Sequence, residues 1–178
     1  MRILSPLLIL MTFGCSSPRA QTQPVDAGEA ASSPPFSNID EMQTRILAAH
    51  NAWRQEVGVP ALQWSEELTA HAQEWANTLR GRGCKADHSG ASEYGENLAW
   101  AGGTNLAPEA VVEMWGAEQA SYDYAANSCA RRKVCGHYTQ IVWRGTETVG
   151  CAVASCSDSE VWVCNYYPAG NVVGQKPY

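Results

Sequence analysis

The distribution of cysteines constrains the fold of this chain more than any other feature of its sequence. The chain has seven cysteines. One stands alone at position 15, and an even set follows between positions 84 and 164. An even set in an exported chain is typical of a disulfide framework, although spacing alone allows 15 pairings of six cysteines. No Cys-x-x-Cys motif occurs, so zinc-finger and thioredoxin-like folds have little support. The set consists of Cys84, Cys129, Cys135, Cys151, Cys156 and Cys164.

The first 14 residues predict export across the inner membrane. Arg2 precedes an apolar stretch over residues 3–13, which resembles a signal peptide and is shorter than the about 20 residues that span a bilayer. Cys15 follows at the position of the modified cysteine of a bacterial lipoprotein, so we expect a lipid anchor there. The protein would then be an outer-membrane lipoprotein or extracellular. The alternative is an ordinary signal peptide cut elsewhere, such as after Ala20, which leaves Cys15 without a role.

The amino-acid composition differs between a predicted tether and a single acidic domain that follows it. Residues 15–38 are mostly Ser, Pro, Ala and Gln and cannot bury a core, whereas residues 39–178 can form one domain. Of 12 basic residues, 11 remain without Arg2, against 18 acidic ones, a formal charge of −7. Nucleic-acid binding needs clustered Lys and Arg, and the one basic run, residues 131–133, is interpreted as a solvated loop. We expect a monomer held at the membrane by its anchor, without a nucleic-acid partner.

Hydrophobic periodicity predicts three helices in the first part of the domain. Apolar residues at spacings of three and four predict helices over residues 38–58 and 65–81. A third helix is predicted over residues 108–119, because Pro108 suits a first turn and Glu109 suits the positive end of the helix dipole. The residues after Gly83, through Gly103, show no such pattern and are expected to be rich in loops.

After the third helix the period changes to two. Alternating residues predict strands at His137–Trp143, Val149–Ser155 and Val161–Tyr166, with a hairpin turn at residues 157–159. Helices followed by strands indicate an α+β domain with an antiparallel sheet.

Four polar side chains stand where the surrounding pattern does not require them: His88, Glu96, Glu118 and His137. Two imidazoles and two carboxylates could bind Zn²⁺ or another divalent cation, or could pair for acid–base chemistry. The alternative is a hydrogen-bonded group that ties loops together. Sequence spacing alone does not choose between these interpretations.

Six short motifs occur in a recognisable order: HSG, GENLAW, WxxE, GHYTQIVW, VGCA and CNYYPAGN. This set resembles the CAP superfamily of cysteine-rich secretory, antigen 5 and pathogenesis-related 1 proteins, and it is most similar to the plant pathogenesis-related 1 type. The resemblance covers residues 39–178. It implies a disulfide-stabilised, three-layer α–β–α sandwich with a central antiparallel sheet. It also implies a cleft lined by the four polar residues, whose histidines bind zinc or another divalent ion in some members.

The same resemblance implies a disulfide pairing and a ligand-binding segment. The segment over residues 115–124 corresponds to an aromatic stretch that some members use to bind sterols, so Trp115, Tyr122 and Tyr124 are candidate ligand-binding residues. Aromatic residues at such spacing also pack protein cores. The implied disulfides are Cys84–Cys156, Cys129–Cys135 and Cys151–Cys164.

Three functions follow as hypotheses. An exported binding module for a lipid, sterol or other small hydrophobic ligand is favoured, because no recognisable catalytic motif occurs. The second is a hydrolase that uses the four polar residues together with Ser89. The third is an effector that presents residues 168–178, which resemble a signalling peptide released from plant relatives. Those relatives carry Asp before the Pro, whereas this chain has Tyr167.

Overall fold

The computed structural model describes residues 39–103 and 105–178. The predicted signal peptide, the lipid anchor at Cys15 and the tether lie outside the described residues. The helices are α1 (Ile39–Glu56), α2 (Glu66–Gly81), α3 (Pro108–Gly116) and α4 (Gly136–Ile141), and one 3-10 turn, η1 (Ala117–Ser121), follows α3. The strands are β1 (Gln63–Trp64), β2 (Gly95–Gly102), β3 (Tyr122–Asp123), β4 (Ser128–Cys129), β5 (Thr148–Ser155) and β6 (Ser159–Tyr167).

One four-stranded sheet forms the middle layer of the domain, in the order β1-β5-β6-β2. The long strands β5 and β2 both pair antiparallel with β6, and the two-residue strand β1 pairs parallel with β5. The sheet is therefore antiparallel except at one short edge. Strands β3 and β4 form a separate small antiparallel pair.

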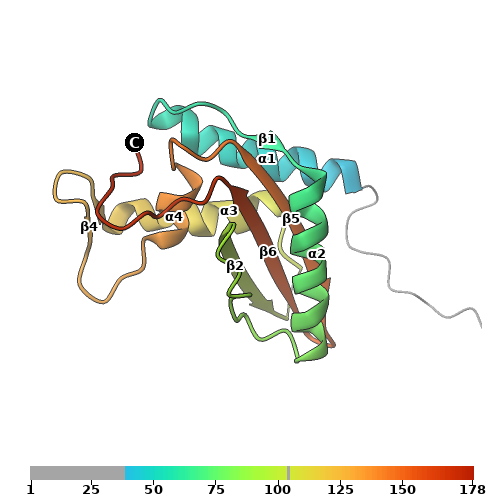
Figure 1. The fold of residues 1–178 in the computed structure, drawn as a ribbon. Helices are drawn as coiled ribbons and strands as arrows, with labels where there is room; N and C mark the ends of the chain where they lie inside the picture. Colours follow the sequence, from blue (N-terminus) through green and yellow to red (C-terminus); the bar gives the residue numbers. More distant parts are fainter. Residues whose placement is uncertain (1–38, 104) are drawn as a thin grey trace, which may run out of the picture. The chain divides into compact units, whose positions relative to one another are not determined.

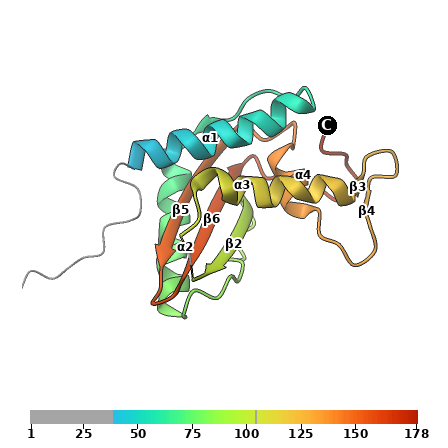
Figure 2. The same cartoon turned by 180° about the vertical axis from the view of Figure 1, so that it is seen from behind.

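Helices cover both faces of this sheet. Figure 1 shows α2 in front of β5 and β6, and Figure 2 shows α1 and α3 on the opposite side. Alternation along β6 explains the two layers, since Val161 and Val163 pack in the cluster that contains Leu79 of α2. Trp162 and Tyr166 point the other way and pack in the larger cluster with α1, α3 and α4. The predicted α–β–α sandwich is confirmed.

The three predicted helices are confirmed with small changes at their ends. Helix α2 begins after Ser65, whose hydroxyl accepts a hydrogen bond from the Leu68 backbone N–H at 3.2 Å and so caps the helix. The α-helical part of α3 ends at Gly116, and the chain continues as the 3-10 turn η1 to Ser121. Glu118 therefore lies in a tighter turn than predicted.

The strand predicted at His137–Trp143 is wrong, because residues 136–141 form helix α4. Helical hydrogen bonds join Thr139 N to Cys135 O at 3.0 Å and Val142 N to Tyr138 O at 3.1 Å. All residues from Tyr138 to Trp143 are buried, so the apolar and polar positions do not mark an inner and an outer face. The alternation that predicted a strand is consequently uninformative here.

The stretch after Gly83 was predicted to be rich in loops through Gly103, but residues 95–102 of it form strand β2. Both ends of this strand are glycines, and its second and third residues are Glu96 and Asn97. These residue types are uncommon in strands, so residue preferences do not predict a strand here. Pairing with β6 along eight consecutive residues overrides that preference.

The implied disulfide pairing is confirmed. Cys84–Cys156 joins the end of α2 to the end of β5, and Cys151–Cys164 links directly opposite positions of β5 and β6. Cys129–Cys135 connects β4 to the residue before α4. Within the two described stretches, no helix is long and apolar enough to cross a membrane.

Candidate functional site

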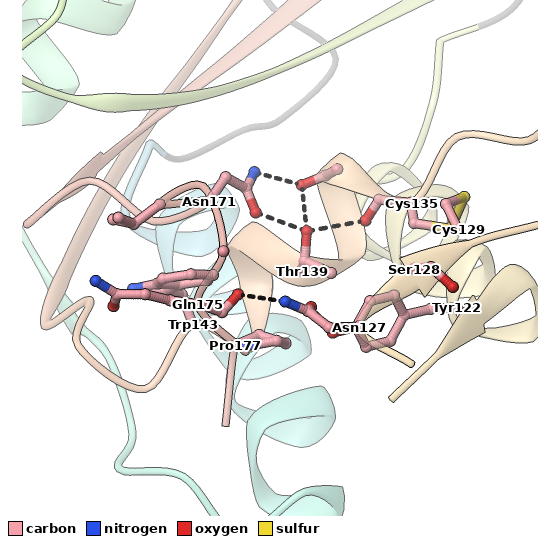
Figure 3. Close-up of a pocket in the computed structure, with 13 residues that line it drawn as sticks. Tyr122, Asn127, Ser128, Cys129, Cys135, Thr139, Trp143, Asn171, Gln175 and Pro177 are labelled. Atoms are coloured by element: carbon pink, nitrogen blue, oxygen red, sulfur yellow. Dashed lines mark hydrogen bonds between the residues drawn. A yellow bond between two sulfur atoms is a disulfide. The ribbon is translucent and has the colours of Figure 1, made fainter. Parts of the chain in front are cut away.

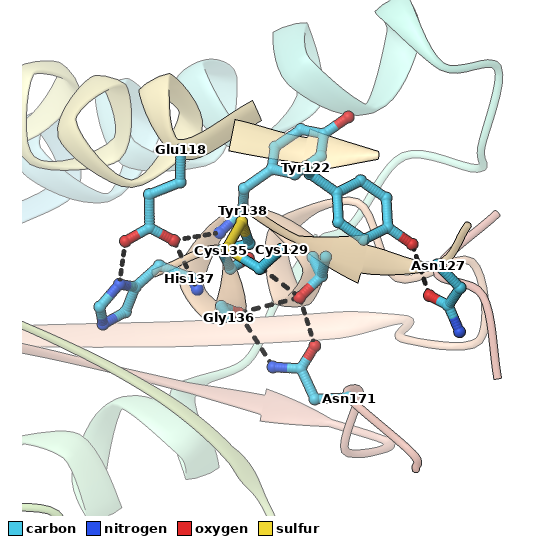
Figure 4. The surroundings of a disulfide bond; sticks show 10 residues. Glu118, Tyr122, Asn127, Cys129, Cys135, Gly136, His137, Tyr138 and Asn171 are labelled. Carbon is cyan, nitrogen blue, oxygen red and sulfur yellow. Dashed lines mark hydrogen bonds and ion pairs between the residues drawn. A yellow bond between two sulfur atoms is a disulfide. The ribbon is translucent and has the colours of Figure 1, made fainter. Parts of the chain in front are cut away.

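His137 and Glu118 form one of two His–Glu pairs (Figure 4). Nδ1 of His137 lies 2.6 Å from Oε1 of Glu118. The other carboxylate oxygen of Glu118 accepts the backbone N–H groups of His137, at 3.0 Å, and Tyr138, at 3.3 Å. Glu118 therefore satisfies backbone donors in the first turn of α4 and orients the imidazole at the same time.

His88 and Glu96 form the second pair. Nδ1 of His88 lies 2.7 Å from Oε1 of Glu96, and this oxygen also accepts the Ser89 backbone N–H at 3.0 Å. The two partners differ in burial, since the His88 side chain is 63% exposed and the Glu96 side chain is 8% exposed. Oε2 of Glu96 is buried and has no hydrogen-bond partner among the described residues.

The four predicted residues are thus brought together as two pairs. Within residues 39–103 and 105–178, no three His, Cys, Asp or Glu side chains form a group that could hold a metal ion. Successive side chains of β2 point to opposite faces of the sheet, which fixes the side on which each of its polar residues lies. Leu98 packs with α2 and Ala99 with the opposite cluster, so Glu96 is on the α2 side of the strand and Asn97 on the other.

Both pairs use the same imidazole atom. A carboxylate that accepts from Nδ1–H fixes the neutral tautomer and leaves the lone pair of Nε2 available. No described residue forms a hydrogen bond with Nε2 of either His88 or His137. The His137 ring also stacks on Trp115, with 6.0 Å between ring centroids. This arrangement can present two oriented nitrogen ligands, or it can hold loops in place.

Asn97 is a site residue that sequence reasoning missed. Its side-chain amide donates to the His137 backbone carbonyl and to the Tyr166 hydroxyl, both at 3.1 Å. Asn97 thereby connects β2 and β6 to the segment that carries His137. The signal that could have found it is its position beside Glu96, as a second polar residue in an otherwise apolar motif.

The three aromatic residues predicted to bind ligand lie in different surroundings. Trp115 is 2% exposed, and its indole N–H donates to the Leu98 carbonyl at 3.0 Å. Tyr122 is half-buried and lines a cavity, and its hydroxyl donates to the Asn127 side chain at 2.6 Å. Tyr124 stacks on Tyr178, with 4.5 Å between ring centroids.

The cavity at Tyr122 has a volume of about 280 Å³ and lies between β4, α4 and the carboxyl-terminal segment (Figure 3). The Cys129–Cys135 disulfide forms part of its wall, and Trp143 and Pro177 contribute apolar surface. Segments that are far apart in the sequence therefore meet around this cavity.

The carboxyl-terminal segment, residues 168–178, packs on the domain. The Asn171 amide donates to the Gly136 carbonyl at 2.9 Å, and its oxygen accepts from the Thr139 hydroxyl at 2.6 Å. Further along, the Pro177 carbonyl accepts the Arg144 backbone N–H at 2.6 Å. Release of this segment as a peptide would have to break these contacts.

Ser89, the candidate nucleophile of the hydrolase hypothesis, forms a hydrogen bond with a backbone group. Its hydroxyl accepts the Ala91 backbone N–H at 3.2 Å. Among the described residues it forms no hydrogen bond with His88, whose Nδ1 contacts Glu96 instead. The serine–histidine contact that activates a nucleophile is therefore not formed.

Comparisons with known proteins agree with this architecture. Pathogenesis-related protein 1 of Arabidopsis thaliana is 48% identical over 143 residues, which cover 80% of this chain and 86% of that protein. The venom allergen-like protein 4 of Schistosoma mansoni has a similar structure, with a TM-score of 0.65 and 27% identity over 78% of this chain and 94% of that one. The crystal structure of NaASP2 with Zn²⁺ has a TM-score of 0.64 and 24% identity over 82% of this chain and 88% of that one, and shows a shared fold.

The family model of the cysteine-rich secretory protein family, CAP, matches residues 47–166. These residues include both His–Glu pairs and all three disulfides. A secretory family also agrees with the export predicted from the first 14 residues. The chain therefore belongs to the cysteine-rich secretory protein (CAP) family, with plant pathogenesis-related 1 proteins among its relatives.

Proposed function

We propose that this protein is an exported, non-catalytic binding module for a small hydrophobic ligand such as a sterol or a lipid. The observation that carries the proposal is the cavity beside Tyr122, where the aromatic segment after α3 meets α4 and the carboxyl-terminal segment. A volume of about 280 Å³ is slightly below the range for ligand pockets, about 300–1,000 Å³. It would therefore enclose one end of a sterol or acyl chain, with the rest outside.

The geometry at Ser89 favours binding over hydrolysis. A serine nucleophile needs a base within hydrogen-bond distance, and the Ser89 hydroxyl contacts a backbone N–H instead. Glu118 is bonded to two backbone N–H groups and one imidazole, so its role is to support α4 and His137.

Saturable uptake of tritiated cholesterol or palmitate by the purified protein tests this function. We expect Tyr122→Ala to weaken the uptake about tenfold, because it removes an aromatic wall of the cavity. Trp100→Ala is the matched control, since Trp100 is an exposed aromatic residue on the edge strand β2. Absence of saturable uptake of both probes, or equal loss in both variants, would remove the proposal.

A divalent cation such as Zn²⁺ at His88 and His137 is a second candidate property. It is favoured by the pairing of Nδ1 of each ring with a carboxylate, which is the support that metal-binding imidazoles have in known sites. Nε2 of His88 and of His137 would be the ligands, with Glu96 and Glu118 positioning them. The cation would supply charge that holds the two pairs together.

Titration calorimetry with ZnCl₂ tests the metal candidate. Both imidazoles must be neutral to bind zinc, so the affinity for zinc should fall with decreasing pH. His88→Ala and His137→Ala should each abolish binding, whereas His71→Ala should not change it. Zinc affinity that is the same at pH 7.5 and pH 5.5 would reject these ligands.

We also propose that Cys15 carries a lipid and holds the protein at the outer membrane. Support comes from the sequence alone, in the apolar stretch that precedes Gly14 and Cys15. Metabolic labelling with tritiated palmitate should label the protein in its own host, and Cys15→Ala should abolish the label. An unlabelled wild-type protein would favour an ordinary signal peptide instead.

A further inference from the structure

A second cavity, outside the Tyr122 region, lies between α2 and the segment that leads into β2. Its volume is about 280 Å³, and His71, Glu74, Tyr94, Glu96 and Asn165 are among the residues that line it. Neither the hydrophobic ligand nor the metal proposed above uses this space. The chemistry of its lining indicates what it could bind.

Glu96 contributes a buried acceptor to this lining. One of its oxygens is bonded to His88 and to the Ser89 backbone, whereas Oε2 is buried without a hydrogen-bond partner. A carboxylate oxygen removed from water without a donor is unfavourable, and native structures rarely contain one without a reason. Oε2 therefore needs a hydrogen-bond donor that the described residues do not supply.

Asn165 provides a second buried polar group beside it. It lies directly opposite Glu96 in the β2–β6 register, which brings their Cβ atoms to about 5 Å. Asn165 is 4% exposed as a whole residue, and its carboxamide forms no hydrogen bond with any described residue, but it is not among the fully buried unpartnered groups and so remains reachable from the cavity. Two neighbouring polar side chains on the α2 side of the sheet thus lack partners at the same cavity.

The charge around the cavity has one sign. Its lining contains Glu74 and Glu96, but no Lys or Arg. Among the described residues, Glu74 takes part in no ion pair. Two carboxylates and no Lys or Arg side chain give this lining a negative potential, so it favours a cation and disfavours an anion.

A larger cavity of about 730 Å³ adjoins the first one and shares Tyr94 with it. It is lined by Glu67, Glu93 and Tyr167 as well, and again by no basic side chain. The Tyr94 ring lies 5.1 Å from the His71 ring and 6.3 Å from the Tyr167 ring. Aromatic walls with nearby carboxylates are suited to an organic cation, because ring faces attract positive charge.

We propose that the smaller cavity binds the primary ammonium group of an organic amine. An ammonium group has three N–H donors, and three side chains of the lining carry acceptor oxygens: Glu96, Asn165 and Glu74. The carbon chain of the amine passes Tyr94 toward the larger cavity. The amine is either a free small molecule or the side chain of a lysine in a peptide, since both carry the same group.

Titration calorimetry of the exported full-length protein with cadaverine (1,5-diaminopentane) tests this site. We expect saturable binding that Asn165→Leu weakens about tenfold, since it removes an acceptor, and Glu74→Gln about threefold to tenfold, since it removes a negative charge. Glu113→Gln is the matched control: it removes the same charge from an exposed position of α3, on the other side of the sheet, and should leave the affinity unchanged. Should Asn165→Leu fail to fold, the exposed position Glu74 decides the outcome alone.

Two further probes define the ligand class. Nα-acetyl-lysine methylamide presents the ammonium group on a peptide-like carrier: binding of this probe assigns lysine side chains to the site, and binding of cadaverine alone assigns free amines. Tetramethylammonium has the charge but no N–H donor, so we expect at least tenfold weaker binding. Equal affinity for tetramethylammonium, unchanged affinity in Glu74→Gln, or absence of cadaverine binding would each overturn the proposal.

Discussion

The imidazole of His50 lies 2.8 Å from the hydroxyl of Tyr166, and this buried contact joins α1 to β6. Nδ1 of His50 lies 2.8 Å from the Ile46 carbonyl, which can only accept, so Nδ1 carries the proton. Nε2 must then accept the Tyr166 O–H, and the Tyr166 oxygen accepts from Asn97 at 3.1 Å. These hydrogen bonds connect α1 through Tyr166 of β6 to Asn97 of β2.

The burial of His50 predicts that stability depends on pH. Burial disfavours the charged imidazole and lowers the pKa of His50 from 6.5 to about 4. Below pH 6.5 the unfolded chain takes up a proton that the folded chain does not, so the free energy of unfolding should fall as the pH drops from 6.5 to 4. The loss should be about 3 kcal/mol from this group, measured by urea denaturation at several pH values.

A pair of variants separates His50 from the carboxylates that also titrate in this range. His50→Gln should be less stable at pH 7, because it disturbs the contact with Tyr166, and its stability should depend less on pH between 6.5 and 4. His71→Gln, at an exposed position on α2, should retain the wild-type slope. A wild-type slope in His50→Gln would contradict the assignment.

Glu118 should matter for folding as well as for the site. Its carboxylate accepts two backbone N–H groups of α4 and one imidazole N–H, so Glu118→Ala leaves these donors unpaired. We expect a loss of about 2 kcal/mol in the free energy of unfolding. Glu113→Ala, at an exposed position of α3, should change it by less than about 0.5 kcal/mol. Equal effects in denaturant titrations would show that Glu118 does not support α4.

Sequence patterns predicted α1 and α2 because each of these helices has a buried face and an exposed face, and α3 because Pro108 and Glu109 mark its first turn. Helix α4 lacks that contrast, because the polar residues Thr139 and Gln140 are buried within it and form hydrogen bonds with the carboxyl-terminal segment. Strand β2 is specified by pairing with β6 rather than by propensity. Tertiary contacts decide the structure of both segments, so local patterns could not predict them.

The residues of the site were predicted by resemblance, but their pairing was not. Sequence order says nothing about which glutamate meets which histidine. The pairing depends on β2, which places Glu96 next to His88, and on the turn after α3, which places Glu118 at the start of α4. The unpartnered groups at Glu96 and Asn165 also arise from register, which requires the sheet to be known.

Gly150 is required by the close contact between β5 and α2. A Cβ atom at this position would lie 2.3 Å from Thr69 N and 2.6 Å from Ser65 O, which are backbone atoms at the start of α2. Gly150→Ala should therefore lower the free energy of unfolding by at least about 2 kcal/mol. Gly81→Ala is the control, because no atom lies within 4 Å of its added Cβ and a helix favours Ala over Gly. Thermal denaturation that ranks the two variants equally would contradict the packing described here.

The disulfides should contribute in the order of the loops that they close. Cys84–Cys156 spans 72 residues and Cys129–Cys135 spans 6. Chain entropy then gives about 4 kcal/mol for the first bond and about 2 kcal/mol for the second. Replacing both cysteines of one pair by alanine, and measuring urea denaturation of each double variant, tests the order. A larger loss from the 129–135 pair would mean that strain or contacts of the native state decide the effect.

The side chain of Arg54 connects several backbone segments in the core. This buried guanidinium donates to four backbone carbonyls, those of Pro60, Ile141, Trp143 and Thr146, at 2.6–2.9 Å. Lysine keeps the charge, but its single nitrogen has three donors and cannot reach acceptors on all sides. Arg54→Lys should therefore cost about 2–4 kcal/mol in the free energy of unfolding. Arg45→Lys on the same helix changes a partly exposed pair with Glu109 and should cost less than about 1 kcal/mol. If both variants lose the same stability in urea, the four carbonyls do not depend on the planar shape of the guanidinium.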